Sequence, residues 1–167
     1  LFHALIGTVP DNYKWAVRLF GIDGTISQGV GELNQVLNVA TSNEEYAYLK
    51  SEVIFLLTFI ELNFSKDEEN IQRVLDIIQK MEKKSPIVVF SEASILIKSN
   101  RNDQAIQVLQ EHSQKETGFR FHYLDFLTGE TKLHRLDKDA HLYYVDYLRN
   151  FKGKSYVKAA YQKLAWH

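Results

Sequence analysis

The sequence contains no cysteine and only two prolines among its 167 residues. The absence of cysteine excludes disulfide bonds and thiolate metal sites. Because proline is the strongest helix breaker and is nearly absent, helices can form along most of the chain. Alternation of apolar and polar residues at the two-residue period of a β-strand is also sparse. We therefore predict an all-α fold.

The chain also lacks a long apolar run and an excess of either charge. Its longest mainly apolar run, Val53–Ile60, is far shorter than the roughly 20 residues that a membrane-spanning helix needs. The formal net charge is -1, which gives no overall electrostatic case for binding nucleic acid or anionic lipid. We expect no membrane span and no nucleic-acid partner. The hydrophobic share of 45% is ordinary for a folded domain with a real core.

What is present is a succession of helix start and stop signals. Pro10 suits the first turn of a short helix over 11–20, which Gly21 would end. Capping boxes at Thr25–Gln28 and Ser42–Glu45 predict helices that run to about residue 40 and about residue 64. About nine helical segments with short links are expected, which implies antiparallel neighbours.

A weak repeat with a period of 35 residues runs through the chain. Asp67, Asn102 and Asp137 recur at that interval, each before an amphipathic stretch, and are predicted helix N-caps. Small residues should lie where paired helices approach closely. The expected close pairs are Ala93 with Ala105 and Thr128 with Ala140. We predict a single domain over 1–167, with repeat units at about 51–84, 85–118 and 119–153.

The pattern of apolar and small residues resembles that of tetratricopeptide repeats. It occurs in three runs, of which the last given is the weakest: Val89, Ala93, Leu96, Ala105, Leu109; Leu124, Leu127, Thr128, Ala140, Tyr144; and Ile54, Leu57, Thr58, Asn70, Val74. The chain departs from the family pattern at Glu92, where a large apolar residue is usual, at Thr128, where glycine or alanine is common, and in lacking the closing proline. The resemblance implies antiparallel helix hairpins stacked as a right-handed α-solenoid. Over Pro10–Leu37 the chain loosely resembles the tetratricopeptide-repeat-39 and yeast outer-mitochondrial-membrane relatives.

In tetratricopeptide arrays the first helix of each hairpin lines a concave groove. Carried over residue by residue, the groove positions would be Phe55, Phe59 and Asn63 in the first unit, Phe90, Ser94 and Lys98 in the second, and Asp125, Gly129 and Lys132 in the third. Such a groove would suit a peptide with an apolar side chain near an acidic group. The family's carboxylate clamp does not match these positions, so recognition of a chaperone's terminal carboxylate is not expected. Alternatively, Phe55 and Phe59 pack on neighbouring hairpins or on flanking sequence.

One segment resembles a catalytic motif. Residues 20–26 are similar to the first motif of haloacid-dehalogenase-type phosphatases, in which an aspartate nucleophile stands two residues before a second aspartate, here Asp23. The nucleophile's position is Gly21 in this chain, and the preceding stretch is predicted to be helical rather than a strand. We therefore prefer a helix that ends in glycine, a turn, and an N-cap at Thr25.

Other candidate sites have simpler structural explanations. Gly29 and Gly31 lack the third glycine of a dinucleotide loop and are attributed to close helix packing. Asp137–Asp139 has no following glycine or glutamate at the spacing of a calcium loop. None of the six histidines forms the i, i+4 pair of a helical zinc motif. We expect no metal and no cofactor.

Aromatic residues crowd the end of the sequence. Tyr144, Tyr147 and Phe151 fall on one helical stripe and are predicted to form core between repeats. A basic and aromatic patch follows, for which a solvated face is the default interpretation: Lys152, Lys154, Tyr156, Lys158 and Tyr161.

These observations predict a non-catalytic scaffold of helical repeats that binds another protein or a peptide. The alternatives are a structural or self-association segment of a larger protein and, more remotely, a degraded phosphatase-like enzyme. Both ends are expected to be cut, since residues 1–6 resemble the end of a helix and residues 156–167 an unfinished one. The sequence indicates neither the partner nor the compartment.

Overall fold

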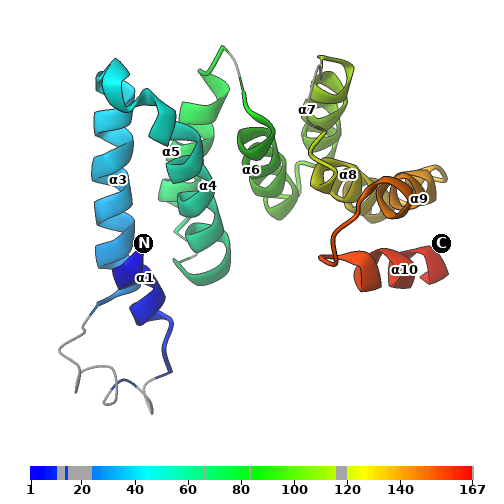
Figure 1. Cartoon of the computed structure of the whole chain (residues 1–167), viewed down its shortest axis with the longest axis horizontal. Coiled ribbons are helices and arrows are strands. Elements are labelled where there is room, and N and C mark those ends of the chain that lie inside the picture. The colour runs from blue at the N-terminus through cyan, green and yellow to red at the C-terminus, as the bar shows by residue number, and fades with distance from the viewer. Residues whose placement is uncertain (11–13, 15–23, 66, 83, 116–119, 167) are drawn as a thin grey trace. The chain divides into compact units, whose positions relative to one another are not determined.

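The computed structural model describes residues 1–10, 14, 24–65, 67–82, 84–115 and 120–166. In these ranges every regular element is a helix and no strand occurs (Figure 1), as the sequence predicts. The contacts divide the chain into two compact units, Leu1–Lys83 (unit 1) and Lys84–His167 (unit 2). The boundary between the units falls beside the expected boundary between the first and second repeat units.

Unit 1 is built from four described α-helices, a 3-10 helix and a π-helix. Its elements are α1 (Phe2–Gly7), α3 (Ile26–Ser42), the 3-10 helix η1 (Glu44–Leu49), α4 (Lys50–Ile60), the π-helix η2 (Glu61–Ser65) and α5 (Glu68–Gln79). Helix α3 packs against α1 and α4, and α4 packs against α5. The core comes from apolar side chains on the facing stripes of these helices, among them Leu33, Leu37, Ile54, Leu57, Val74 and Ile78.

Two of the predicted helix starts in unit 1 are confirmed. The Thr25 hydroxyl accepts a hydrogen bond from the Gln28 amide at 3.1 Å and caps α3. The Asp67 carboxylate caps α5 by accepting from the amides of Glu69 and Asn70. Each cap satisfies a backbone donor that the first helical turn leaves free, which is worth about 1 kcal/mol.

The long helix expected over 43–64 is not a single α-helix. Asn43, rather than Ser42, supplies the side-chain cap, and the first turns form the 3-10 helix η1. The α-helical part begins at Lys50, and the last turn widens into the π-helix η2. Helix α5 ends at Gln79. The helix predicted over 11–20 and its Gly21 stop lie outside the described residues, apart from Lys14.

The two glycines of α3 differ in their surroundings. A methyl group on Gly29 would lie 2.5 Å from the Ala4 side chain and 2.6 Å from the Ala4 backbone nitrogen, so α1 and α3 approach closely there. The same addition at Gly31 would meet nothing within 4 Å. Close packing is therefore confirmed for Gly29 and wrong for Gly31, which faces open space.

Unit 2 contains five described α-helices. They are α6 (Pro86–Lys98), α7 (Asn102–Lys115), α8 (Tyr123–His134), α9 (Ala140–Asn150) and α10 (Val157–Trp166). Each packs against the next along the chain, and α8 also contacts α6. Ala93 and Ala105 are fully buried in the packed helices α6 and α7, as expected for small residues at a close helix pair.

The second half of unit 2 has an aromatic core. Tyr144 and Tyr147 of α9 are fully buried, which confirms that they are core residues, and Phe151 stacks on Tyr147 at a ring separation of 4.9 Å. Phe126 of α8 contacts both tyrosine rings. Tyr147 donates a hydrogen bond to the Ser155 carbonyl at 2.6 Å, which ties the loop before α10 to this core.

Two sequence expectations in unit 2 are wrong. Asn102 is the first residue of α7, and its buried side-chain oxygen has no hydrogen-bond partner, so it is not a cap. Asp137 lies before Asp139, the residue that immediately precedes α9, and its carboxylate is paired with cations instead. Gly129 lies in the middle of the continuous helix α8.

Candidate partner-binding surface

The predicted groove residues of unit 1 lie on α4 and the π-helix that follows. Phe59 is 47% exposed, and Asn63 is exposed with its side-chain amide donating to the Phe59 carbonyl at 2.7 Å. Phe55 is half-buried. Phe59 and Asn63 therefore lie together and are open to solvent, as a ligand surface requires.

Phe64 joins this surface although the sequence did not indicate it. Its ring meets the Phe59 ring edge to face at 5.8 Å, and it is 42% exposed. Residues five apart do not share a face in an α-helix. The wider π-helical turn of η2 brings them together, since its hydrogen bonds join residues i and i+5. We call Phe59, Asn63 and Phe64 the phenylalanine surface.

The predicted residues of α6 form a second group. Phe90 is half-buried and meets the Phe121 ring edge to face at 6.2 Å. Ser94 is also half-buried, whereas Lys98 is exposed near the end of the helix. Only Lys98 among these three presents most of its side chain to solvent.

The predicted residues of α8 are engaged within unit 2. Asp125 accepts a hydrogen bond from Arg120 at 2.8 Å and lies 3.3 Å from His122. Lys132 is buried, and its ammonium lies 2.7 Å from Asp139 and 3.8 Å from Asp137. A ligand that approached either charge would have to compete with these internal partners.

Gly129 also faces inward. A methyl group there would lie 3.1 Å from the ring of Tyr144, so the small residue allows α8 and α9 to pack closely. The position that the family register assigns to the groove is thus a helix contact in this structure.

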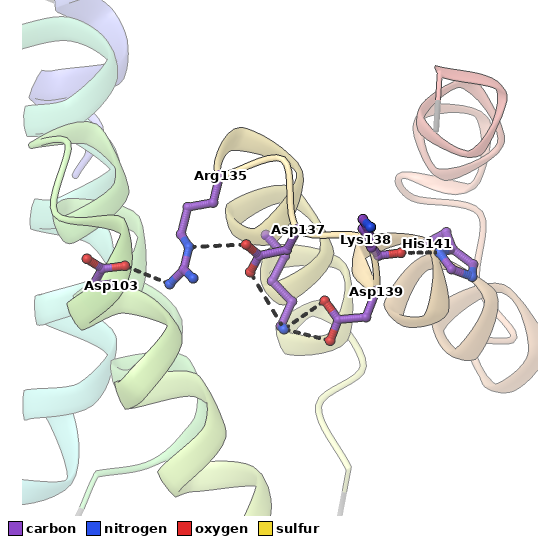
Figure 2. A network of polar contacts seen from close by, with 7 residues as sticks. Asp103, Arg135, Asp137, Lys138, Asp139 and His141 are labelled. Atoms are coloured by element: carbon purple, nitrogen blue, oxygen red, sulfur yellow. Dashed lines mark hydrogen bonds and ion pairs between the residues drawn. The ribbon is translucent and has the colours of Figure 1, made fainter.

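Lys132 belongs to a polar network at the turn between α8 and α9. Figure 2 shows Arg135 between Asp103 of α7 and Asp137, with ion-pair distances of 2.6 and 3.4 Å. The hydrogen bond from Lys132 lowers the pKa of Asp139. Burial opposes the charge on Lys132, but the hydrogen bond to Asp139 and the nearby carboxylates outweigh it and raise its pKa. The network holds both residues charged and joins α7, α8 and the start of α9.

Glu61, which the sequence analysis did not select, is buried without a partner. It is 1% exposed, and neither carboxylate oxygen has a hydrogen-bond partner. Thr58, one turn earlier, is also buried with an unpartnered hydroxyl. The signal was available, because Glu61 continues the apolar stripe of Ile54 and Leu57 at helical spacing.

The phosphatase-like motif lies largely outside the part of the chain that the structure describes. Asp23 and Gly21 lie outside the described residues, and Thr25 serves as the cap of α3. In the described ranges no group of three or more potential metal ligands gathers. None of the helices in those ranges has the length and apolar character to cross a bilayer.

Comparisons with protein-family models, curated proteins and solved structures give no match. The likeness to tetratricopeptide repeats therefore stays a prediction.

Proposed function

We propose that this chain is a non-catalytic scaffold of stacked helical hairpins that binds another protein or a peptide. The serial packing within each unit supports this proposal, because α6 to α10 each contact the next helix along the chain. Serial contact is what repeat architectures require, since each hairpin buries its apolar stripe on its neighbour. Surfaces left open by such packing are available to a partner.

The phenylalanine surface is the observation that carries the proposal. Two aromatic rings, each nearly half exposed, lie in edge-to-face contact where α4 continues into η2. Aromatic anchors of this kind often dominate binding energy at protein interfaces. Removing their exposed area from water would contribute about 1 kcal/mol per ring at the usual rate for apolar surface.

The chemistry of the surface indicates the kind of ligand. Asn63 lies beside the rings, but its amide nitrogen already donates to the Phe59 carbonyl. The remaining contact area of Phe59 and Phe64 is apolar. A peptide that inserts an aliphatic or aromatic side chain against the two rings would fit this arrangement.

Selection from a random displayed peptide library against the folded chain tests the proposal. We expect enrichment of peptides with apolar anchors, and a tenfold or greater loss of affinity in the Phe59→Ser variant. Tyr48→Ser is the matched control, because Tyr48 is an exposed aromatic residue of the same unit that belongs to η1. Circular dichroism should show that both variants remain folded. If no peptide is enriched, or if affinity is unchanged in Phe59→Ser and Phe64→Ser, the proposal is wrong.

Self-association is a second candidate function, and α1 favours it. Phe2 and Leu5 of this short helix are each more than half exposed, and Leu1, which precedes it, is 43% exposed. A second copy of the chain could cover them. Sedimentation equilibrium should then show a dimer that dissociates in the Phe2→Ser variant, whereas a monomer at all concentrations would exclude this function.

A further inference from the structure

The last 20 described residues of unit 2, residues 147–166, include basic side chains but no acidic ones. Residues 147–166 contain one arginine and four lysines and no acidic residue, whereas the whole chain has a net charge of -1. The first turn of α10 also contains no acidic side chain to offset the positive end of the helix dipole. This segment therefore carries a net positive charge, although Asp146 precedes it directly and the protein as a whole is nearly neutral.

Three of these five cations are open to a partner. Lys163 is paired with Glu130 at 2.6 Å, and Lys152 donates to the Arg149 carbonyl at 3.3 Å. The side chains of Arg149, Lys154 and Lys158 are exposed, and no ion pair joins them to the described residues. They can receive carboxylates without first breaking an internal salt bridge.

Exposed aromatic residues lie among these cations. On α10, Lys158, Tyr161 and Trp166 fall within one helical face, while Ala160 is buried on the opposite side. Tyr161 is 62% and Trp166 65% exposed. In Figure 1, α10 lies beside α9, and packing between them covers only its inner side.

Two of the exposed rings already have one face in contact. Tyr156, just before α10, stacks on Phe126 at 4.9 Å. The ammonium of Lys163 lies 5.1 Å from the centre of the Trp166 ring. The exposed parts of Tyr161 and Trp166 remain open to contact with apolar side chains of a partner.

We infer that this C-terminal basic surface (Arg149, Lys154, Tyr156, Lys158, Tyr161 and Trp166) docks an acidic segment of a protein partner. The segment would place carboxylates against the three open cations and apolar side chains against Tyr161 and Trp166. The inference rests on the proposed function, but it uses a surface of unit 2 that does not include the phenylalanine surface.

Charge and shape favour a protein segment over other anionic partners. Three open cations would neutralise only a few phosphates, which gives a nucleic acid little affinity at physiological salt. A membrane surface needs a continuous apolar stripe to insert. On α10 the polar side chains of Lys158 and Gln162 share the exposed face with Tyr161 and Trp166.

Fluorescence anisotropy with the full chain tests the inference. The probe is a labelled peptide that alternates Glu with Leu and Phe, and the comparison peptide carries Gln in place of Glu. We expect binding of the first peptide that weakens as salt rises, and at least tenfold weaker binding of the second. A single-stranded oligonucleotide and vesicles of phosphatidylserine and phosphatidylcholine, tested under the same conditions, should bind more weakly than the acidic peptide.

Single substitutions test whether the acidic peptide binds at the C-terminal basic surface. Lys158→Glu should weaken the acidic peptide about tenfold, and Trp166→Ala should weaken it without removing the salt dependence. Lys138→Glu is the matched control, since it reverses an exposed lysine before α9 and makes the same change in net charge. Circular dichroism should show the same helical signal for all three variants.

The inference is overturned if the acidic peptide does not bind, if the oligonucleotide or the vesicles bind more tightly, or if Lys138→Glu weakens binding as much as Lys158→Glu. In these cases the proposed function still stands when displayed peptides bind in a way that depends on Phe59. If neither test yields a ligand, both are wrong.

Discussion

Two glutamates in the described part of this chain are buried, but only one of them has a hydrogen-bond partner. Glu92 of α6 is nearly fully buried, and its carboxylate accepts a hydrogen bond from Lys84 at 2.7 Å. Glu61 is equally buried but has no hydrogen-bond partner. Burial of an unpaired charge costs several kcal/mol, whereas a paired one recovers most of that cost. We therefore expect Glu61 to destabilise unit 1, whereas Glu92 is paired with Lys84.

Replacement of each glutamate by glutamine should have opposite effects on stability. Glu61→Gln should raise the free energy of unfolding by about 1 to 3 kcal/mol, because a neutral amide costs less to bury than an unpaired carboxylate. Glu92→Gln should lower it by about 1 kcal/mol, because it weakens a charge-assisted hydrogen bond. Urea unfolding at neutral pH measures both changes. A loss of stability in Glu61→Gln would show that its carboxylate has a stabilising partner.

The buried tyrosines make the stability of the chain sensitive to high pH. Burial raises the pKa of Tyr147 to about 12, with smaller contributions from Tyr123 and Tyr156. Burial, followed by the Glu130 carboxylate, also raises the pKa of Tyr144. These shifts leave stability unchanged below about pH 10, where the phenols are neutral in both states. Above that, the unfolded chain loses protons first, so stability should fall from about pH 10 to about pH 12.

A Tyr144→Phe variant tests this pH dependence. The Tyr144 hydroxyl has no hydrogen-bond partner, so its removal should cost little at neutral pH. The variant should lose less stability than the original chain when urea unfolding is repeated in alkaline buffer. In a pH titration of the folded variant, tyrosinate absorbance should show one fewer phenol with a raised pKa. Equal alkaline losses in the two proteins would contradict the assigned pKa of Tyr144.

At the scale of elements, the glycines of α3 provide a matched pair. Gly31→Ala should raise the free energy of unfolding by about 0.5 to 1 kcal/mol, because alanine favours a helix and the added methyl group meets nothing. Gly29→Ala should lower it, because the methyl group would collide with the Ala4 backbone. Thermal unfolding of both variants measures the contrast. Stabilisation by Gly29→Ala would contradict the close approach of α1 and α3.

The sequence predicted most elements but not all of their boundaries. Local signals were sufficient at Thr25 and Asp67, where a short side chain and the following amides form the cap on their own. The repeat interval predicted an N-cap at Asp137, and this prediction is wrong. The Asp137 carboxylate pairs with Lys132 and Arg135 instead of capping α9. Spacing alone cannot show such tertiary partners.

The sequence also predicted only part of the candidate site. The register of the family resemblance selected Phe59 and Asn63, which are exposed neighbours. It missed Phe64, because a regular α-helix was assumed where a π-helical turn changes which residues share a face. It also selected Lys132, which is buried and paired with Asp137 and Asp139 in the turn between α8 and α9.

At the scale of the whole molecule, each unit has its own core and its own candidate surface. Unit 1 presents the phenylalanine surface, and unit 2 presents the C-terminal basic surface. The first is apolar and the second combines cations with exposed aromatic rings, so the two would select different segments of a partner. We therefore propose that the chain is a scaffold whose specificity lies in side chains at the surface of its helices.

The most direct test is a nuclear magnetic resonance titration of the isotope-labelled chain with a peptide enriched by display. We expect amide shifts that saturate with peptide and that cluster at residues 59–64 or at residues 149–166. The shifts at residues 59–64 should disappear in Phe59→Ser, and those at residues 149–166 in Lys158→Glu. Saturable binding that leaves the amides of both surfaces unshifted would contradict the proposal.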